Sequence, residues 1–424
     1  MPWEDARRTA GEAAAPLPAL TRPLAYATGH ALAAPLTALT DLPAFDTSAM
    51  DGWVVSGPGP WPVGECGIRA GEVPGPLPAG MARQIATGAP VPAGASAVLR
   101  LEDGLVAGGV LRSPAALPRG RDIRPRGQEC AAGMTLIEAG ATVTPALLAL
   151  AAAAGHDELR VHRQPSVLLL VTGAELARSG IPRDGRVRDA LSPLLLPWLE
   201  ACGARLDGMS LLGDQAGPLG EEIRECPADV IITTGSTSAG PTDLLHGVLR
   251  EAGARLIVDS VAVRPGHPML LAELPPPGGP RDRPPAGGPR AGDHLLPGGH
   301  LLPADHLPGN RLRGGQRRWL VGLPGNPLAA VAGLVTLAQP LLRRLGGHSR
   351  PATRSLVVDE AIPGHPRDVR LLPALAEDTR AVPLPFDGPA MLRGAAAADV
   401  LVVVPPGGVP AGGRVAVICV APGH

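Results

Sequence analysis

The chain has 424 residues, and although 45% of them are hydrophobic only 2% are aromatic, so its core must be built from aliphatic side chains and alanine. A formal net charge of −1 provides no long-range field for a polyanion, which argues against nucleic acid or a membrane surface as a partner. The five cysteines form no C-x-x-C pair, and no apolar stretch is long enough to cross a membrane. We therefore expect a soluble, unexported cytoplasmic protein with several domains.

The first part of the chain predicts a strand-rich domain that is inserted, in sequence, between two segments of a smaller linker domain. Residues 45–129 are rich in glycine, proline and β-branched residues and are expected to form strands. Residues 130–164 contain one clear helix, at 145–154, and together with residues 1–44 are expected to form a linker domain on either side of the strands.

Residues 165–347 show a different pattern, because short apolar runs alternate with amphipathic stretches. The apolar runs are SVLLLVTG, ADVIITTG, RLIVDSVAV and WLVGLPGN, and the amphipathic stretches are 192–203, 219–225 and 243–253. This alternation predicts a doubly wound parallel sheet with helices on both faces. Within it, residues 275–317 are a Pro- and Gly-rich tract of low complexity, which we expect to be a disordered insertion between two strands.

Residues 350–424 contain short strands without long helical periods and predict a small C-terminal β domain. The fold class expected for the whole chain is thus multidomain α/β. It combines the doubly wound parallel-sheet domain with a β-rich domain, a helical linker domain and a C-terminal β domain.

The loop after the run ADVIITTG is the first candidate binding site, because the carboxyl ends of parallel strands gather loops and free backbone N–H groups. The loop runs through Thr234, Gly235, Ser236 and Ser238 and reaches a helix start at Asp243. Its hydroxyls and small residues suit an anionic, phosphate-bearing small molecule. The same segment equally fits an ordinary strand-to-helix turn in which Asp243 caps the helix.

Two further loops carry residues suited to an anion. In the segment VRPGHP, Arg264 and His267 flank a Pro-Gly turn and could both be aimed at one anion, although such a turn is also typical of a solvated surface. In the segment LPGNP, Pro324 and Pro327 make a rigid wall ahead of a helix at 328–345.

Three carboxylates are expected near the same strand ends. Glu175 follows the first strand, Asp214 follows another, and Asp243 ends the phosphate loop. Clustered beside a phosphate, they would recruit Mg²⁺ through the oxygen ligands that this ion prefers. For any one of them alone, capping of a helix is the simpler interpretation.

Several motifs in fixed order resemble the molybdopterin molybdenumtransferase family, which includes bacterial MoeA and the E domain of gephyrin. In chain order they are FDTSAMDG (45–52), RQIATGAPVPAGASAVLRLED (83–103), RPRGQECAAG (124–133), VTGAEL (171–176), TTGSTSAGPTD (233–243), VRPGHP (263–268) and LPGNP (323–327). Seven motifs spread over nearly the whole chain are far more specific than one glycine loop. The resemblance implies a homodimeric enzyme that inserts molybdate into adenylylated molybdopterin and releases AMP, assisted by Mg²⁺.

The resemblance also implies roles for particular residues. The functional carboxylates of the family fall on Asp51, Glu129, Glu175, Asp214 and Asp243. Thr87 matches as well, and Arg264 and His267 stand where the family commonly has two lysines. Asp51 and Thr87 would reach the pocket of the other subunit, so each site would be shared between the two chains of the homodimer. Other proteins of molybdenum cofactor biosynthesis are implied as partners.

The sequence departs from the family pattern at several positions. Ala174 replaces an acid beside Glu175, Ser236 replaces a second glycine in the phosphate loop, and Pro389 stands where serines are typical. These changes leave a second hypothesis open, a catalytically weakened paralogue that binds molybdopterin or a partner without turnover. A third hypothesis is another enzyme that shares only the sheet domain, such as a nicotinamide-nucleotide deamidase, but the motifs within residues 45–133 argue against it.

Overall fold

The computed structural model describes residues 1–235, 244–277 and 317–420. Contacts within the chain divide it into two compact units. Unit 1 contains residues 1–20, 29–31 and 162–424, and unit 2 contains residues 21–28 and 32–161. Except for its two ends, the tract at 275–317 that the sequence predicts to be an insertion lies outside the described residues.

The centre of unit 1 is a six-stranded sheet in the order β16-β13-β17-β21-β20-β18. Its strands are β13 (Ser166–Thr172), β16 (Arg205–Leu212), β17 (Val230–Thr234), β18 (Arg255–Asp259), β20 (Leu270–Leu274) and β21 (Arg318–Leu323). β13 pairs in parallel with both β16 and β17, and all seven of its residues are buried. A continuous apolar strand is typical of a parallel sheet covered on both faces.

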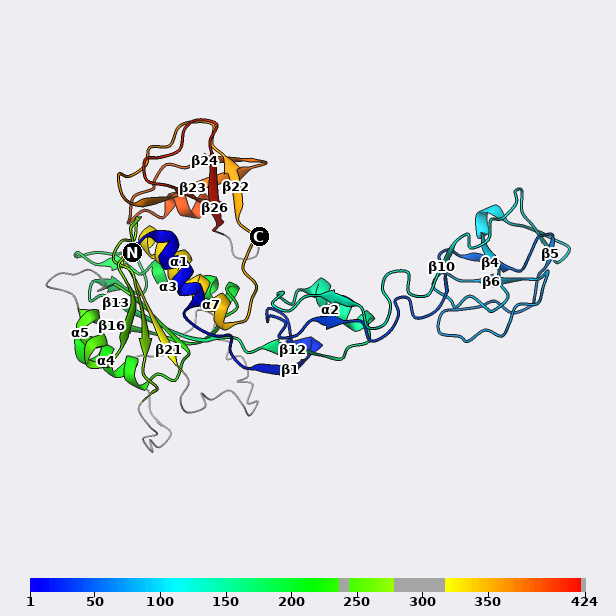
Figure 1. Ribbon diagram of the computed structural model, residues 1–424, viewed down its shortest axis with the longest axis horizontal. Coiled ribbons are helices and arrows are strands. Elements are labelled where there is room, and N and C mark those ends of the chain that lie inside the picture. The colour runs from blue at the N-terminus through cyan, green and yellow to red at the C-terminus, as the bar shows by residue number, and fades with distance from the viewer. Residues whose placement is uncertain (236–243, 278–316, 421–424) are drawn as a thin grey trace. The chain divides into compact units, whose positions relative to one another are not determined.

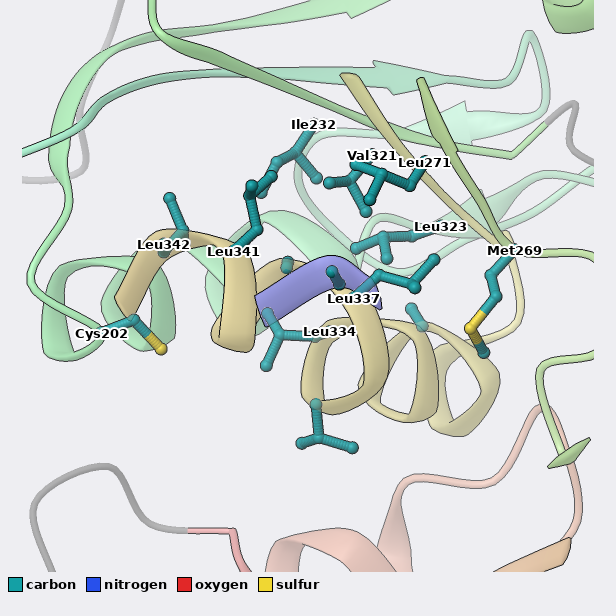
Figure 2. Close-up of a cluster of buried hydrophobic side chains, with 14 of the residues drawn as sticks. Cys202, Ile232, Met269, Leu271, Val321, Leu323, Leu334, Leu337, Leu341 and Leu342 are labelled. Atoms are coloured by element: carbon teal, nitrogen blue, oxygen red, sulfur yellow. The ribbon is translucent and has the colours of Figure 1, made fainter. Parts of the chain in front are cut away.

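Helices cover the two faces of this sheet, as expected from the alternation of side chains along its strands. Val167, Leu169 and Val171 of β13 face one core cluster, which also holds α3 (Leu191–Ala201) and the long helix formed by α6 (Pro327–Gly333), the π-helical turn η3 (Leu334–Ala338) and α7 (Gln339–Leu345). Figure 2 shows Leu334, Leu337 and Leu341 of that helix beneath the sheet residues Ile232 and Val321. Leu168 and Leu170 face the second cluster, with α4 (Ala216–Glu225) and α5 (Leu244–Glu251).

The helix Pro327–Leu345 is the one described helix that is long and apolar enough to cross a membrane, and 78% of its apolar window is buried. This burial is what its place in the core of unit 1 requires.

The sheet differs from the prediction in one strand, because β20 runs antiparallel to both of its neighbours, β18 and β21. The chain turns back after β18 without a crossover helix, so β20 can only enter the sheet in the opposite direction.

The N-terminal helix α1 (Trp3–Glu12) packs in unit 1 against η3 and α7, and Figure 1 shows it in dark blue beside α7. The indole Nε1 of Trp3 donates a buried hydrogen bond of 2.9 Å to the Thr336 hydroxyl. Residues 1–20, which the sequence analysis groups with the linker, thus lie with the sheet. The apolar side of α1 is buried there through Trp3, Ala6 and Ala10.

The C-terminal part of unit 1 is a closed β barrel. Its strands are β22 (Arg354–Val357), β23 (Val369–Glu377), β24 (Arg380–Pro383), β25 (Val400–Val404) and β26 (Arg414–Cys419), with the helix α8 (Arg393–Ala397) between β24 and β25. The order β23-β24-β22-β26-β25 is closed by an additional pairing of β25 with β23. The short strand β19 (Val263–Arg264), which follows β18 in the sheet domain, joins this barrel beside β23. Two short strands that follow β13 in the chain, β14 (Leu176–Ala177) and β15 (Val187–Arg188), pair in parallel with each other.

Most of the regular elements of unit 2 are short strands. One sheet is β6 (Ala82–Ile85), β4 (Gly52–Val55) and β7 (Ala97–Arg100), and another is β5 (Trp61–Pro62), β9 (Val110–Arg112) and β8 (Leu105–Ala107). The remaining pairs are β1 (Ala19–Pro23) with β12 (Glu158–His162), β2 (Leu36–Thr37) with β11 (Thr135–Ile137), and β3 (Thr47–Ser48) with β10 (Ile123–Arg124).

The helix α2 (Pro145–Ala153) begins in unit 2 where Thr144 caps it, because the Thr144 side chain accepts a hydrogen bond from the Leu147 amide. Pro145 then occupies the first helical position, where a missing N–H group costs nothing. With the strand-rich part, the parallel-sheet domain and the C-terminal barrel in place, the predicted multidomain α/β fold class is confirmed.

Candidate functional site

The carboxyl ends of β13, β16, β17 and β21 meet at one edge of the unit 1 sheet, and β16 and β17 lie on opposite sides of β13. Such a switch point leaves room for a ligand in open α/β sheets. Two hydrogen bonds tie the strand ends together. Thr172 at the end of β13 donates through Oγ1 to the Thr234 carbonyl at 2.6 Å, and the Gly173 amide donates to the Leu212 carbonyl at 3.1 Å.

Thr234 and Gly235 form the beginning of the predicted phosphate loop. Thr234 is buried, and its hydroxyl has no hydrogen-bond partner among the described residues. Gly235 has a φ of +83°, and a Cβ atom there would lie 2.9 Å from the Thr172 Oγ1 atom. The Gly235 amide donates to the Leu323 carbonyl at 2.9 Å, which joins this loop to the end of β21. Ser236, Ser238 and Asp243 lie outside the described residues.

Two of the three predicted carboxylates lie on adjoining turns. The Ala174 amide donates to Asp214 Oδ2 at 3.1 Å, so the turn that carries Glu175 contacts the turn after β16. Both Glu175 and Asp214 are exposed. Their oxygen atoms are of the kind that Mg²⁺ prefers. Within residues 1–235, 244–277 and 317–420 no three His, Cys, Asp or Glu side chains gather closely enough to hold a metal ion.

The LPGNP segment forms the turn between β21 and α6. Pro324 is buried directly after the strand, and Pro327 is the first residue of the helix, a position that suits proline. A Cβ atom on Gly325 would lie 3.5 Å from the Gly235 Cα atom, so this turn lies against the phosphate loop. The first amides of α6, on Leu328 and Ala329, donate to the Pro389 carbonyl of the C-terminal barrel at 3.0 and 3.2 Å.

Arg264 and His267 both have partners that fix one side of the group. The Arg264 Nε atom donates to Asp368 Oδ2 at 2.8 Å. His267 Nδ1 lies 2.8 Å from the Val261 carbonyl, and since a carbonyl can only accept, Nδ1 carries the proton and donates. His267 is exposed, so its Nε2 atom faces away from the backbone partner. The Arg264 guanidinium, which donates to this carboxylate, holds the pKa of the Asp368 carboxyl below its usual value.

In unit 2 the structure brings two of the predicted residues together. The Thr87 amide donates to Asp51 Oδ1 at 2.7 Å, and both side chains are exposed at the ends of their strands. Glu129 lies elsewhere in this unit. It lines a cavity of about 430 Å³ with Leu42, Pro43, Thr47, Arg124 and Gln128.

Two contacts join the barrel to the sheet domain. Asp368 binds Arg264 across 104 positions of the chain, and Pro389 caps α6 with a backbone carbonyl. The sequence singles out Pro389 only as a departure from the family pattern, and no local pattern marks Asp368. An aspartate before a strand is ordinary, and its signal lies only in the packing of the barrel on the sheet domain.

Comparison with protein families matches three regions in order. Residues 1–155 match the MoeA N-terminal region (domain I and II), residues 168–344 match a probable molybdopterin binding domain, and residues 355–420 match the MoeA C-terminal region (domain IV). Matches on both sides of the sheet domain exclude the hypothesis that the chain shares only that domain with this family.

Curated relatives carry the same family name. A molybdopterin molybdenumtransferase of Synechococcus elongatus is 32% identical over 269 residues, which are 60% of this chain and 67% of that protein. A molybdopterin molybdenumtransferase 2 of Mycobacterium tuberculosis is 35% identical over 272 residues, which are 59% of this chain and 66% of that protein. None of these relatives supports a paralogue without turnover.

Among solved structures, a MoeA protein of Pyrococcus horikoshii shares the fold with a TM-score of 0.73 and 18% identity, and each chain covers 99% of the other. The matched regions extend from the first residue to the C-terminal barrel. The chain belongs to the molybdopterin molybdenumtransferase (MoeA) family.

Proposed function

We propose that this protein inserts molybdate into adenylylated molybdopterin and releases AMP. The names of its relatives support the transfer of molybdenum to molybdopterin. The observation that carries the proposal is the convergence of the Glu175 turn, Asp214, Gly235 and Pro324 at the switch point of the sheet. An adenylylated pterin is an anion, and this edge offers backbone approach at glycine where a Cβ atom would collide.

The proposed roles follow from charge. Molybdate is itself an anion, so it would approach a phosphate-bearing substrate only where cationic or donor groups offset the repulsion. Arg264 and His267 supply such groups, while Thr234, Gly235, Ser236 and Ser238 would surround the substrate phosphate. Pro324 and Pro327 would form a rigid wall of the pocket.

We assign Mg²⁺ to the carboxylates Glu175, Asp214 and Asp243. Glu175 and Asp214 fit such an ion because both offer exposed oxygens on turns joined by a hydrogen bond. When bound, the ion would neutralise charge that develops on the phosphate oxygens.

A reconstituted assay tests the activity. Purified protein with adenylylated molybdopterin, molybdate and Mg²⁺ should release AMP, and Glu175→Gln should suppress the release by about a hundredfold or more, since the neutral amide cannot offset the metal charge. Glu200→Gln is the matched control, because Glu200 is exposed on α3 away from the strand ends. Tight binding of the pterin by the wild type without AMP release would overturn the proposal and favour the paralogue without turnover.

We further propose a homodimer in which Asp51, Thr87 and Glu129 of one subunit complete the site of the other, with contacts through the linker residues 1–44 and 130–164. Mixing inactive Asp51→Asn and Glu175→Gln proteins tests this. After subunit exchange, shared sites would restore about a quarter of wild-type activity, because half of the dimers are mixed and each mixed dimer has one intact site. Sites made within one chain would restore none.

The proposed localisation of the protein is the cytoplasm. All five cysteines are free thiols, which suits a reducing cytoplasm. Other proteins of molybdenum cofactor biosynthesis are the proposed partners, as donors of the pterin nucleotide or acceptors of the cofactor.

A further inference from the structure

The short strand β19 brings a substrate loop of the sheet domain into the C-terminal barrel. Val263 pairs with Val369 and Arg264 with Arg370 in a parallel register. Partners in such a ladder point to the same face of the sheet. The side chain of Arg264 is therefore presented on the same face of the barrel as the side chains of Arg370 and of Asp368, two positions before it.

Asp368 meets Arg264 on that face and binds only one side of its guanidinium group. The Nε atom donates to Asp368 Oδ2 at 2.8 Å. The Asp368 side chain is 12% exposed, whereas that of Arg264 is 55% exposed. Among the described residues the two terminal nitrogens of Arg264 have no hydrogen-bond partner. One edge of the guanidinium is thus fixed, and the forked end that suits a tetrahedral oxyanion is left accessible.

His365 orders the turn that carries Asp368. Its Nδ1 atom accepts hydrogen bonds from the Arg367 and Asp368 amides at 3.3 and 3.0 Å. Two amides pointing at one ring nitrogen assign the proton of this histidine to Nε2. The turn at 365–368 is therefore closed on itself, and Asp368 presents its carboxylate to Arg264 from a fixed backbone.

We propose that Asp368 is a positioning residue, which holds Arg264 through Nε so that its terminal nitrogens receive an oxyanion of the substrates. The inference rests on the proposed function, in which Arg264 contacts that oxyanion. An arginine with two exposed terminal nitrogens otherwise samples many rotamers, and ordering it on binding weakens affinity. Asp368 orders Arg264 before the anion binds and so lowers the entropy cost of binding. Asp368 belongs to the barrel, whereas the loop that carries Arg264 belongs to the sheet domain.

The test compares Asp368→Ala and Asp368→Asn in the AMP-release assay, with separate titrations of molybdate and of adenylylated molybdopterin. We expect Asp368→Ala to raise KM for one of these two substrates by about tenfold with kcat nearly unchanged, since the anion must then order Arg264 itself. The substrate whose KM rises identifies the oxyanion. Asp368→Asn keeps an acceptor for Nε and should recover part of the loss.

A double-mutant cycle separates positioning from a structural role. Because Asp368 acts through Arg264, Asp368→Ala should have no further effect on KM in an Arg264→Ala background. Asp359→Ala is the matched control, since Asp359 pairs with Arg380 at 3.1 Å in the same barrel and both side chains are exposed. The control should leave both KM values unchanged.

Three results would overturn the inference. One is an unchanged KM for both substrates in Asp368→Ala, and another is an equal rise in KM with and without Arg264. The third is a fall in melting temperature with a loss of kcat alone, which would make the pair merely structural. If the wild type releases no AMP, the proposed function fails. Calorimetry with molybdate alone or phosphate alone then decides whether Asp368→Ala weakens oxyanion binding, and unchanged or undetectable binding overturns the inference as well.

Discussion

Gly235 shows how one residue can be required at the edge of the sheet. Its φ of +83° lies in the left-handed region, and a Cβ atom would come within 2.9 Å of the Thr172 hydroxyl that bonds to the Thr234 carbonyl. Gly235→Ala should therefore destabilise the protein by roughly 1 to 3 kcal/mol and shift the strand ends that meet there. We expect a melting temperature lower by a few degrees, with AMP release reduced by a larger factor than the loss of folded protein explains.

Gly247→Ala provides the matched control for this substitution. Gly247 lies inside α5, and a Cβ atom there would meet nothing within 4 Å. Alanine in an open helical position stabilises by about 0.5 to 1 kcal/mol relative to glycine. Equal stability changes in the two variants would contradict the close packing that we describe at Gly235.

His348 makes stability depend on pH. Burial, together with the nearby charges of Arg343, His30 and His162, lowers its pKa from 6.5 to about 4. In the unfolded chain the ring binds a proton near pH 6.5, whereas in the folded protein it does so only near pH 4. The unfolded state therefore binds more protons between these values, and stability falls as the pH is lowered through this window.

Thermal melts between pH 7 and 4 measure this effect. The contribution of His348 should be roughly 1 kcal/mol for each pH unit inside the window. His348→Gln, which cannot be protonated, should lose less stability than the wild type over the same range. His156→Gln in unit 2 controls for the removal of a histidine elsewhere, and identical pH profiles for wild type and His348→Gln would refute the prediction.

At the scale of elements, a buried hydrogen bond joins the helix α1 to η3. The Trp3 indole donates to Thr336 Oγ1 at 2.9 Å, and the same hydroxyl donates to the Ala332 carbonyl at 2.6 Å. Thr336→Val keeps the shape but leaves the indole N–H unsatisfied, which should destabilise by about 1 to 3 kcal/mol. Thr336→Ser keeps the hydroxyl and should lose much less. Chemical unfolding of both variants checks this, and equal losses would show that the methyl group rather than the hydroxyl matters.

Local patterns were sufficient for elements whose residues carry their own signal. The buried run at 166–172 and the periodic stretch at 191–201 are recognisable because strand and helix periods differ. β19 and β20 carry no such signal. β19 has two residues and exists through its pairing with Val369 and Arg370, and the direction of β20 depends on the turn before it. The Arg264–Asp368 pair is hidden for the same reason, because it joins residues 104 positions apart.

The residues of the predicted site also differ in whether local sequence or tertiary packing determines their position. Gly235 and Pro324 follow strands that their own residues specify, so motif order was enough to place them at one edge. The grouping of α1 with the sheet could not be read from residues 1–20, since an amphipathic helix does not say which surface buries its apolar side. The placement of Ser236, Ser238 and Asp243 stays a prediction.

At the scale of the whole molecule, the two ends of the low-complexity tract are fixed side by side. Leu274 at the end of β20 pairs with Arg318 at the start of β21. Arg318 is buried and donates to the Pro275, Ile223 and Cys226 carbonyls. Antiparallel neighbours with such ends need only a hairpin loop of about two to five residues.

Replacing residues 278–316 with Gly-Ser should therefore leave the fold and AMP release close to those of the wild type. The anchors on both sides are retained, and shortening a loop whose ends are already adjacent changes the closure entropy only slightly. Melting temperature and AMP release measure the outcome. A second variant with a Gly-Ser tract of the original length separates loop length from loop sequence. If the short variant loses stability while the long one keeps it, the hairpin cannot close without strain. A loss of activity in both variants at unchanged stability would instead mean that the native tract takes part in the reaction.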